Sequence, residues 1–238
     1  MNQKINFENI LFLDIETVPE ERDFASLSEE KKELFALKTQ YQRKDVHSPS
    51  EFYSRAGIWA EFGKIVCIST GFFANFNSIN RTFHLKSFYG EELQLLKDFK
   101  NYLETQFDRP QHLLCGHNAK EFDFPFISRR MVINHISLPE KLNLFGKKPW
   151  QVSHLDTMEL WKFGDYKHYS SLRLLTSILG IPTPKDDIDG SMVGEVYYKE
   201  KDIERIRLYC EKDTVAVAQV LLRFNNKPLI QSNHIVLN

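Results

Sequence analysis

Short apolar runs and amphipathic periods alternate along this chain, and the alternation predicts its secondary structure. Apolar runs bounded by turn-forming residues indicate strands, whereas apolar positions that recur once per helical turn indicate helices. By these rules the sequence predicts four strands, over residues 9–13, 64–73, 81–88 and 112–116. It predicts helices over residues 26–43, 91–107, 121–132, 170–179 and 203–223. Strands and helices mixed in this order predict an α/β domain with a mixed sheet.

The stretch over residues 20–60 interrupts this pattern and predicts an insertion after the first strand. Ser26, three residues before a glutamate, fits a capping box at the start of the insertion's helix. Leu27, Leu34, Leu37 and Tyr41 fall on one face of that helix, and the other face is charged. The insertion would cover a cleft, bind a partner or set substrate length, and the sequence does not choose among these.

The composition is that of a globular protein. The chain has 238 residues, of which 42% are hydrophobic and 26% are charged, and this content is too apolar for a disordered protein. The formal net charge of −1 excludes a uniformly basic surface but allows a local nucleic-acid site. We expect one domain over residues 1–238, in which 224–238 form a C-terminal tail.

Apolar runs and cysteines indicate where the protein resides. No apolar run approaches the roughly 20 residues that span a bilayer, and the first ten residues are too polar for a signal peptide. Cys67, Cys115 and Cys210 are widely spaced and lie in no CxxC motif. We therefore expect reduced thiols in a cytoplasmic protein with no membrane contact.

Two carboxylates follow the first predicted strand. Asp14 and Glu16 are two residues apart, so on a strand their side chains point to the same face. Like charges crowded at the end of a core strand are costly unless a cation neutralises them, and hard oxygen ligands select Mg²⁺ or Mn²⁺. The same pair also fits a turn at a solvated rim.

A second acid lies in an apolar segment near the centre of the chain. Asp123 stands between Phe122 and Phe124, where a charge is costly without a partner. Asn118, five residues earlier, is suited to fix the preceding turn by hydrogen bonding. The alternative is an aspartate that simply favours the start of a helix.

A third acid lies in the last predicted helix. Tyr209 and Asp213 are four residues apart and share one helical face. Ile206 and Val217 lie near that face, which indicates that it is turned inward, where an aspartate needs a metal or hydrogen bonds. A core tyrosine beside a surface aspartate is the ordinary alternative.

Together the three segments resemble the motifs of a known nuclease superfamily. They read Asp14-x-Glu16, Asn118-x3-Phe122-Asp123-x-Pro125 and Tyr209-x3-Asp213, in the order of the exonuclease motifs of the DEDD 3′–5′ exonucleases. The spacing of Tyr209 is that of the DEDDy branch. The chain is similar to stand-alone predicted exonucleases related to the exonuclease domain of family-B DNA polymerases. The resemblance implies a ribonuclease-H-like fold, with a mixed five-stranded sheet flanked by helices and a helical insertion after the first strand.

The same resemblance implies an activity and assigns residues to it. It implies a metal-dependent 3′–5′ exonuclease that hydrolyses phosphodiester bonds from the 3′ end of single-stranded or frayed DNA by a two-metal-ion mechanism. Two Mg²⁺ or Mn²⁺ ions would be held by Asp14, Glu16, Asp123 and Asp213. Tyr209 would orient the attacking water. Three residues would contact substrate: Thr17, Asn118 and Phe122. The resemblance gives Asp156 a supporting role near the site and no role as a ligand.

Other functions and further residues remain open at this stage. An exoribonuclease of the ribonuclease D type uses the same acids and tyrosine, so RNA is a second candidate substrate. A catalytically silent nucleic-acid-binding module is a third hypothesis, and protein partners are unknown. Several basic residues would follow the phosphate backbone or belong to a solvated surface: Lys120, Arg129, Arg130, Lys147, Lys148, Lys162 and Lys167. Histidines 117, 154 and 168 lack the spacing of zinc sites and are expected to be structural.

Overall fold

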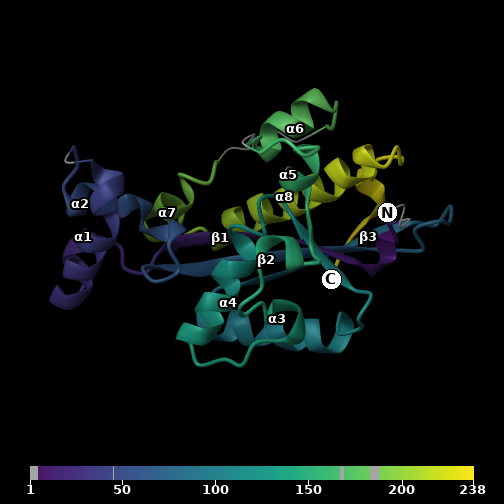
Figure 1. Cartoon of the computed structure of the whole chain (residues 1–238). Helices are drawn as coiled ribbons and strands as arrows, with labels where there is room; N and C mark the ends of the chain where they lie inside the picture. The colour runs from purple at the N-terminus through teal and green to yellow at the C-terminus, as the bar shows by residue number, and fades with distance from the viewer. Residues whose placement is uncertain (1–4, 45, 167–168, 183–187) are drawn as a thin grey trace.

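A mixed six-stranded sheet forms the centre of the computed structural model, which describes residues 5–44, 46–166, 169–182 and 188–238. The strand order is β5-β4-β1-β2-β3-β6 (Figure 1). The strands are β1 (Ile10–Pro19), β2 (Gly63–Ala74), β3 (Thr82–Tyr89), β4 (Leu113–Gly116), β5 (Leu155–Asp156) and β6 (Ile235–Leu237). The pairs β1–β2 and β2–β3 are antiparallel, and the other three pairs are parallel.

The sheet differs from the expected one in two places. It has six strands instead of five, because part of the expected C-terminal tail pairs with β3 as the short edge strand β6. The first strand also continues beyond residues 9–13, since its antiparallel pairing with β2 extends to Pro19 opposite Gly63. Asp14 and Glu16 therefore lie inside β1 and not at its end. The predicted α/β architecture with a mixed sheet is confirmed.

Helices cover both faces of the sheet. Figure 1 shows α3 (Glu92–Gln106) and α4 (Asp123–Ile133) on one face and α8 (Ile203–Phe224) on the other. The short helices α5 (Thr157–Trp161) and α6 (Leu172–Ile178) lie on the α8 side, and α7 (Val193–Glu195) precedes a π-helical turn at Val196–Glu200. The helices expected over residues 91–107, 121–132, 170–179 and 203–223 are thus present within a few residues of the expected bounds.

The alternation along β1 decides which face receives the acids. Leu13 and Ile15 are buried in the core cluster that contains α3 and α4. Phe12 is buried in a second cluster with residues of α8. Because side chains alternate between the faces of a strand, Asp14 and Glu16 lie on the α8 face.

The insertion forms a small helical unit at one end of the sheet, away from both labelled termini in Figure 1. Its helices are α1 (Glu29–Arg43) and α2 (Pro49–Phe52), and the second of these lies outside the helix expected over residues 26–43. The N-cap of α1 is Ser28 and not Ser26, which ends a 3-10 turn (Phe24–Ser26) capped by Asp23.

The buried face of α1 is not the one that the leucine spacing indicated. Phe35 is fully buried and packs edge-on against Tyr53 and Phe62, with ring centroids 5.2 Å apart in both pairs. Of the residues expected to form the apolar face, Leu27 is buried beside Phe35 but precedes α1. The other three, Leu34, Leu37 and Tyr41, are exposed to 53, 67 and 88%.

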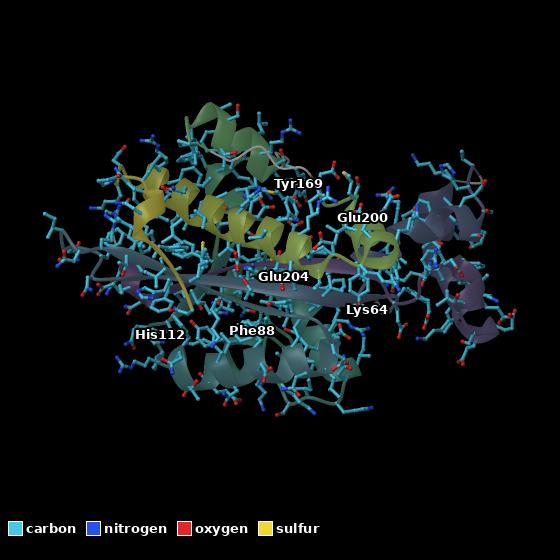
Figure 2. All side chains as sticks on the ribbon, turned by 180° about the vertical axis from the view of Figure 1, so that it is seen from behind. Lys64, Phe88, His112, Tyr169, Glu200 and Glu204 are labelled. Atoms are coloured by element: carbon cyan, nitrogen blue, oxygen red, sulfur yellow. The ribbon has the colours of Figure 1, made fainter. Side chains whose placement is uncertain are left out.

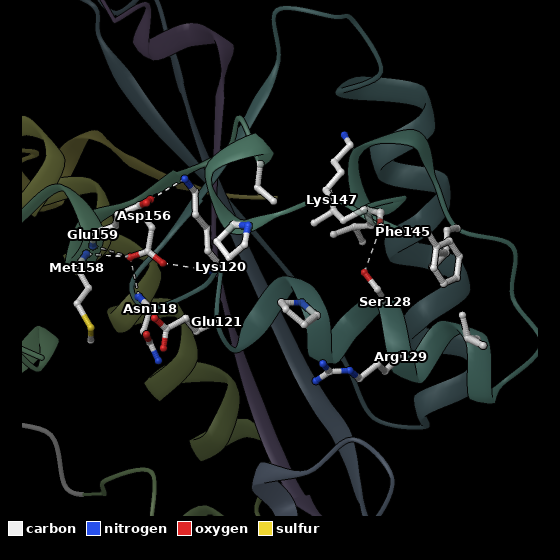
Figure 3. A pocket seen from close by; sticks show the side chains of 18 of the residues that line it. Asn118, Lys120, Glu121, Ser128, Arg129, Phe145, Lys147, Asp156, Met158 and Glu159 are labelled. Atoms are coloured by element: carbon white, nitrogen blue, oxygen red, sulfur yellow. Dashed lines mark hydrogen bonds and ion pairs between the residues drawn. The ribbon is translucent and has the colours of Figure 1, made fainter. Parts of the chain in front are cut away.

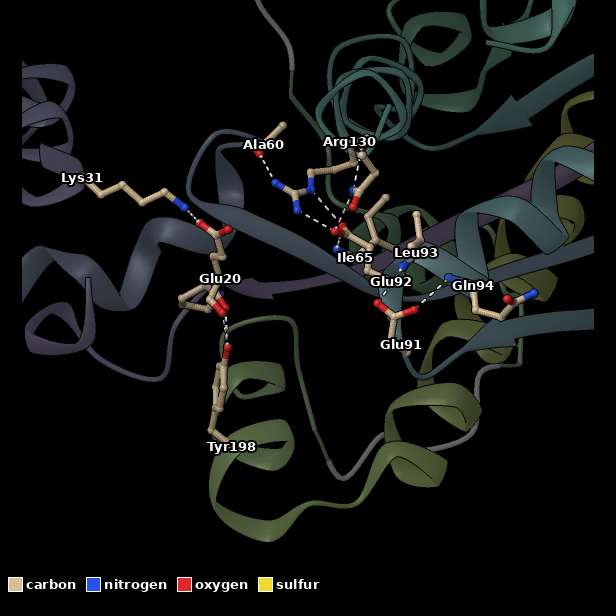
Figure 4. A network of polar contacts seen from close by, with 12 residues as sticks. Glu20, Lys31, Ala60, Ile65, Glu91, Glu92, Leu93, Gln94, Arg130 and Tyr198 are labelled. Atoms are coloured by element: carbon tan, nitrogen blue, oxygen red, sulfur yellow. Dashed lines mark hydrogen bonds and ion pairs between the residues drawn. The ribbon is translucent and has the colours of Figure 1, made fainter. Parts of the chain in front are cut away.

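Polar contacts join the insertion and α4 to the sheet (Figure 4). The Tyr198 hydroxyl donates to the carbonyl oxygens of Pro19 and Glu20, at 2.6 and 2.9 Å. The Arg130 guanidinium forms a buried bidentate pair with Glu92, with N–O distances of 2.8 and 2.5 Å. The sequence placed Arg130 among the residues that follow a phosphate backbone or belong to a solvated surface. The structure shows instead that Arg130 is a buried structural cation. Two other residues singled out in the sequence lie outside the described residues. They are Lys167, one of the basic residues, and His168, one of the histidines expected to be structural.

Two further features concern membrane-spanning helices and the state of the cysteines. In the part of the chain that the structure describes, no helix combines the length and apolarity required to traverse a bilayer. Cys67, Cys115 and Cys210 are buried free thiols.

Candidate functional site

Asp14 and Glu16 are placed where β1 is bulged and open on one side. Its pairing with β4 covers only Ile10 to Phe12, so among the described residues the edge beyond Phe12 has no strand neighbour on that side. The register with β2 shifts between Glu16 and Thr17, which is the mark of a β-bulge. Bulges re-aim side chains beside functional sites. Glu16 is only 6% exposed and Asp14 is partly buried.

The turn from β4 to α4 brings Asp123 to the open edge of β1. Gly116 ends β4 at a point where a Cβ atom would lie 2.4 Å from Cβ of Ala119, so a side chain has no room there. Asn118 follows with φ of +61°, a conformation that asparagine tolerates better than most residues. Asp123 then begins α4, is 4% exposed, and accepts a hydrogen bond from the amide of Ile15 in β1.

Asp156 holds this turn in place from the next strand. Its carboxylate accepts hydrogen bonds from the amides of Asn118 (2.9 Å) and Lys120 (3.0 Å), as Figure 3 shows. It also accepts from the amides of Met158 (2.9 Å) and Glu159 (3.3 Å) at the start of α5. Both oxygens of Asp156 are occupied by backbone donors, which agrees with a supporting role and not with a metal ligand.

The helix α8 supplies the remaining groups. The Tyr209 hydroxyl forms a hydrogen bond with the carboxylate of Asp213, one helical turn further on. The thiol of Cys210 donates to the carbonyl oxygen of Asp14 at 3.3 Å and lies 3.6 Å from Oδ2 of the same residue. These contacts bind the middle of α8 directly to the bulged part of β1.

The four acids lie close enough for their charges to interact. Burial first, and then repulsion from Asp213, Glu16 and Asp123, raises the pKa of Asp14 well above its usual value. Burial and the charge of Asp213 likewise raise the pKa of Glu16, and burial raises the pKa of Asp123 to about 8. Burial followed by the charge of Asp213 raises the pKa of Tyr209 far above that of an exposed tyrosine.

This cluster suits a divalent cation. Potential ligand atoms of Asp14, Glu16 and Cys210 lie within 4.8 Å of one another. Buried carboxylates that repel one another gain most from a cation, and carboxylate oxygens are the ligands that Mg²⁺ and Mn²⁺ prefer. The donor set therefore fits the metal ions that the motifs implied.

The structure thus brings together residues from three separate sequence segments: Asp14, Glu16, Asp123, Tyr209 and Asp213. Thr17 follows the bulge directly and is partly exposed. Phe122 immediately precedes α4 and is half-buried, with its ring 5.3 Å from that of Phe126. Asn118 lies in the turn that Asp156 holds. The roles assigned to these residues remain predictions.

Sequence reasoning missed one member of the site. Cys210 was expected only as a reduced core residue, yet its thiol contacts Asp14. Its place directly after Tyr209, on a helix whose inward face carries Asp213, was the available signal. The expected structural histidines are confirmed where described. His117 contacts Thr157 and the carbonyl of Ser170, and His154 bonds to backbone groups through both ring nitrogens.

Comparison with known proteins gives one family and one fold. The family model described as a predicted 3′–5′ exonuclease related to the exonuclease domain of PolB matches residues 58–228. Asp123, Tyr209 and Asp213 fall within that match, whereas Asp14 and Glu16 precede it. No curated protein matches the chain. The structure of the family B DNA polymerase from the hyperthermophilic archaeon Pyrobaculum calidifontis is similar, with a TM-score of 0.54 and 15% identity over 90% of this chain. The chain spans 24% of that polymerase chain, and the likeness shows a common fold.

Proposed function

Because the chain belongs to the family of predicted 3′–5′ exonucleases related to the exonuclease domain of PolB, we propose that it is a metal-dependent 3′–5′ exonuclease. Its substrate is DNA with a single-stranded or frayed 3′ end, and it hydrolyses phosphodiester bonds from that end. The observation that carries the proposal is the buried cluster of Asp14, Glu16, Asp123 and Asp213, whose charges repel one another. A purely structural core would be more stable without such a cluster.

Four carboxylates hold two Mg²⁺ or Mn²⁺ ions in this proposal: Asp14, Glu16, Asp123 and Asp213. When bound, the ions supply an activated water and stabilise the charge on the phosphoryl group and on the leaving 3′-oxygen. Asp14 would be a central ligand of these ions, because the charges of the three other acids all act on it. Cys210 contributes a hydrogen bond that orients Asp14 and is not needed as a ligand.

Tyr209 positions the water and does not remove its proton. Its pKa lies far above neutral pH because the hydroxyl is buried beside carboxylates. It therefore keeps its proton and acts through hydrogen bonds to Asp213 and to the attacking water. Thr17, Asn118 and Phe122 surround the place of the terminal nucleotide in this proposal. The three free thiols suit a reducing compartment such as the cytoplasm.

A time course on denaturing gels tests the proposal. The substrates are 5′-labelled DNA and RNA oligonucleotides of matched sequence, incubated with Mg²⁺, with Mn²⁺ or with EDTA, and Asp14→Asn is the matched inactive protein. We expect a descending ladder on DNA that requires both metal and Asp14. A ladder on RNA alone would assign the protein to the ribonuclease D type. No ladder on either substrate would overturn the proposal in favour of a silent binding module.

A further inference from the structure

A pocket of about 530 Å³ lies between α4, α5 and the segment over residues 134–154, which joins these two helices (Figure 3). Its walls are mainly apolar, and Leu138, Leu144, Val152 and Met158 contribute to them. Four basic side chains line it: Lys120, Arg129, Lys147 and Lys162. Lys120 and Lys162 pair with Glu159 and Glu121 of the same lining, at 2.6 and 4.0 Å. Arg129 and Lys147 are the exposed cations of the rim. An apolar floor with a basic rim suits a ligand that is flat and apolar in one part and anionic in another.

The pocket and the acid cluster share the start of α4. Asp123 begins this helix and points to β1, whereas Pro125, Ser128 and Arg129 of the same helix line the pocket. Asn118, whose amide is fixed by Asp156, forms part of the pocket's wall. The start of α4 therefore links the pocket to Asp123.

Large exposed aromatic side chains line this pocket or neighbour residues that do. Phe145 is part of the lining, and Trp150 and Phe163 directly follow the lining residues Pro149 and Lys162. Phe145, Trp150 and Phe163 are 77, 77 and 85% exposed, and Tyr169 is 65% exposed. Figure 2 shows Tyr169 on the α8 side of the sheet, opposite Phe88 and His112. Aromatic rings left in water in such numbers mark a binding surface more often than a structural one.

Basic side chains accompany these rings. The ammonium of Lys162 lies 4.8 Å from the ring centroid of Tyr169, and that of Lys148 lies 5.7 Å from the ring of Trp150. The Tyr169 hydroxyl contacts Glu121 at 3.4 Å, which ties this ring to the turn before α4. Exposed rings alternating with cations are the pattern by which proteins hold single strands, because bases stack on the rings and phosphates meet the cations.

We propose that this surface, made of the pocket and the rings of Phe145, Trp150, Phe163 and Tyr169, binds the single-stranded part of the substrate upstream of its terminal nucleotide. The inference rests on the proposed function for the position of the 3′ end, but its contacts are separate from the acid cluster. A strand of several nucleotides then binds more tightly than a mononucleotide. A protein partner would use the apolar walls alone and would leave the cations without a role.

Strand binding is measured by fluorescence anisotropy with labelled oligothymidylate, on full-length Asp14→Asn protein in EDTA so that no hydrolysis occurs. In that background, Phe145→Ala with Trp150→Ala is expected to weaken binding about tenfold for each stacked base lost. Arg129→Gln with Lys147→Gln is expected to lower the slope of log affinity against log salt by about 0.7 for each phosphate contact removed. All four side chains are exposed, so these changes spare the core.

Matched substitutions elsewhere serve as controls. Tyr41→Ala removes a ring that is 88% exposed on α1, and Lys97→Gln removes an exposed cation on α3. Both should bind oligothymidylate like the parent. Unchanged affinity in the pocket variants, or equal losses in the controls, overturns the inference and leaves a protein partner as the occupant to seek.

Hydrolysis separates this inference from the proposed function. The p-nitrophenyl ester of thymidine 5′-monophosphate presents one nucleotide to the acid cluster and none to the pocket. Pocket variants with an intact Asp14 should hydrolyse the ester at the parental rate and long strands several-fold more slowly. If the parent hydrolyses neither substrate yet binds strands through the pocket, the proposed function fails and the inference stands. If long strands are cut at the parental rate by the pocket variants, the inference fails and the function stands.

Discussion

The carboxylate of Asp156 accepts the backbone amides of both Asn118 and Lys120, at 2.9 and 3.0 Å. Those two amides belong to the turn that ends β4 and begins α4, and the turn places Asp123 against the amide of Ile15. A residue that binds no metal in the proposed mechanism therefore sets the position of one that does. The arrangement resembles the way in which outer hydrogen-bond partners orient metal ligands in general.

Asp156→Asn is expected to destabilise the fold by about 2–3 kcal/mol, because an amide nitrogen replaces one of two oxygens that accept backbone donors. Strand cleavage should fall with it, since Asp123 is no longer held. The midpoint of urea unfolding and the cleavage rate measure the two effects. Asp98→Asn, which changes an exposed aspartate on α3, is the matched control. Equal midpoints for the two variants would show that the hydrogen bonds of Asp156 do not stabilise the turn.

The buried pair of Arg130 and Glu92 gives a second prediction. Arg130→Met leaves Glu92 buried without its cation, which is expected to cost about 3–5 kcal/mol. The double variant Arg130→Met with Glu92→Gln should recover part of that loss, because glutamine still accepts from the amide of Ile65 (2.7 Å to Glu92 in the parent). Urea unfolding of the parent, of Arg130→Met, of Glu92→Gln and of the double variant gives the coupling energy. A single variant as stable as the parent would return Arg130 to the surface role that its sequence suggested.

The sequence predicts a structural feature well when residues close in the sequence determine it. The acids Asp14, Asp123 and Asp213 stood out because each breaks an apolar pattern within its own segment. The strands and main helices followed from the same periodicity. The wrong face of α1 has a distant cause, since Phe35 is buried by Phe62, far along the chain. Arg130 likewise met its partner Glu92 only through the tertiary fold.

The site itself shows the same limit. The contact of Cys210 with Asp14 joins residues almost a whole chain apart. The helical pattern indicates that Cys210 lies near the inward face of its helix, but not which residue it meets there. The pocket beside α4 needs the course of residues 134–154, which periodicity left irregular. The family motifs supplied part of this long-range information, since they implied which acids lie together. They did not show how the turn at Asn118 is held.

Removal of one charge from the acid cluster should stabilise the metal-free protein. In EDTA, Asp14→Asn relieves repulsion with Glu16, Asp123 and Asp213, so its melting temperature is expected to exceed that of the parent. Addition of Mg²⁺ or Mn²⁺ should raise the melting temperature of the parent and change that of the variant much less. Thermal melts at about pH 8 with and without metal measure both effects. A parent that melts higher than the variant in EDTA would show that repulsion is not the dominant interaction of Asp14.

Tyr209→Phe is expected to slow hydrolysis by about 10–100-fold without abolishing it, which is the effect of losing a hydrogen bond to a charged group. The loss should be similar across neutral and alkaline pH, because the high pKa of Tyr209 keeps its hydroxyl protonated throughout. Rates measured under single-turnover conditions from about pH 6 to about pH 9 test this. A loss that grows with pH along a tyrosine titration would instead assign Tyr209 the role of a base.

His154 predicts a pH dependence that can be isolated from that of the acids. Its Nδ1 accepts from the amide of Leu114 (3.2 Å) and its Nε2 donates to the carbonyl of Lys141 (2.7 Å), so the neutral ring is satisfied on both sides. Burial lowers its pKa from 6.5 to about 4. His154 therefore takes up a proton near pH 6.5 in the unfolded chain but only near pH 4 in the folded chain. The free energy of unfolding decreases as the pH falls from about 6.5 to about 4.

The variant His154→Gln can accept and donate at the same two places but does not titrate. The acid cluster has raised pKa values and acts in the opposite direction, gaining stability as the pH falls, but it is common to both proteins. The difference in unfolding free energy between parent and variant therefore reports His154 alone. Between about pH 7.5 and about pH 5 this difference should shift by about 2 kcal/mol against the parent. Urea unfolding at the two pH values measures it, and a difference that stays constant would mean that His154 is protonated as readily in the folded chain as in the unfolded one.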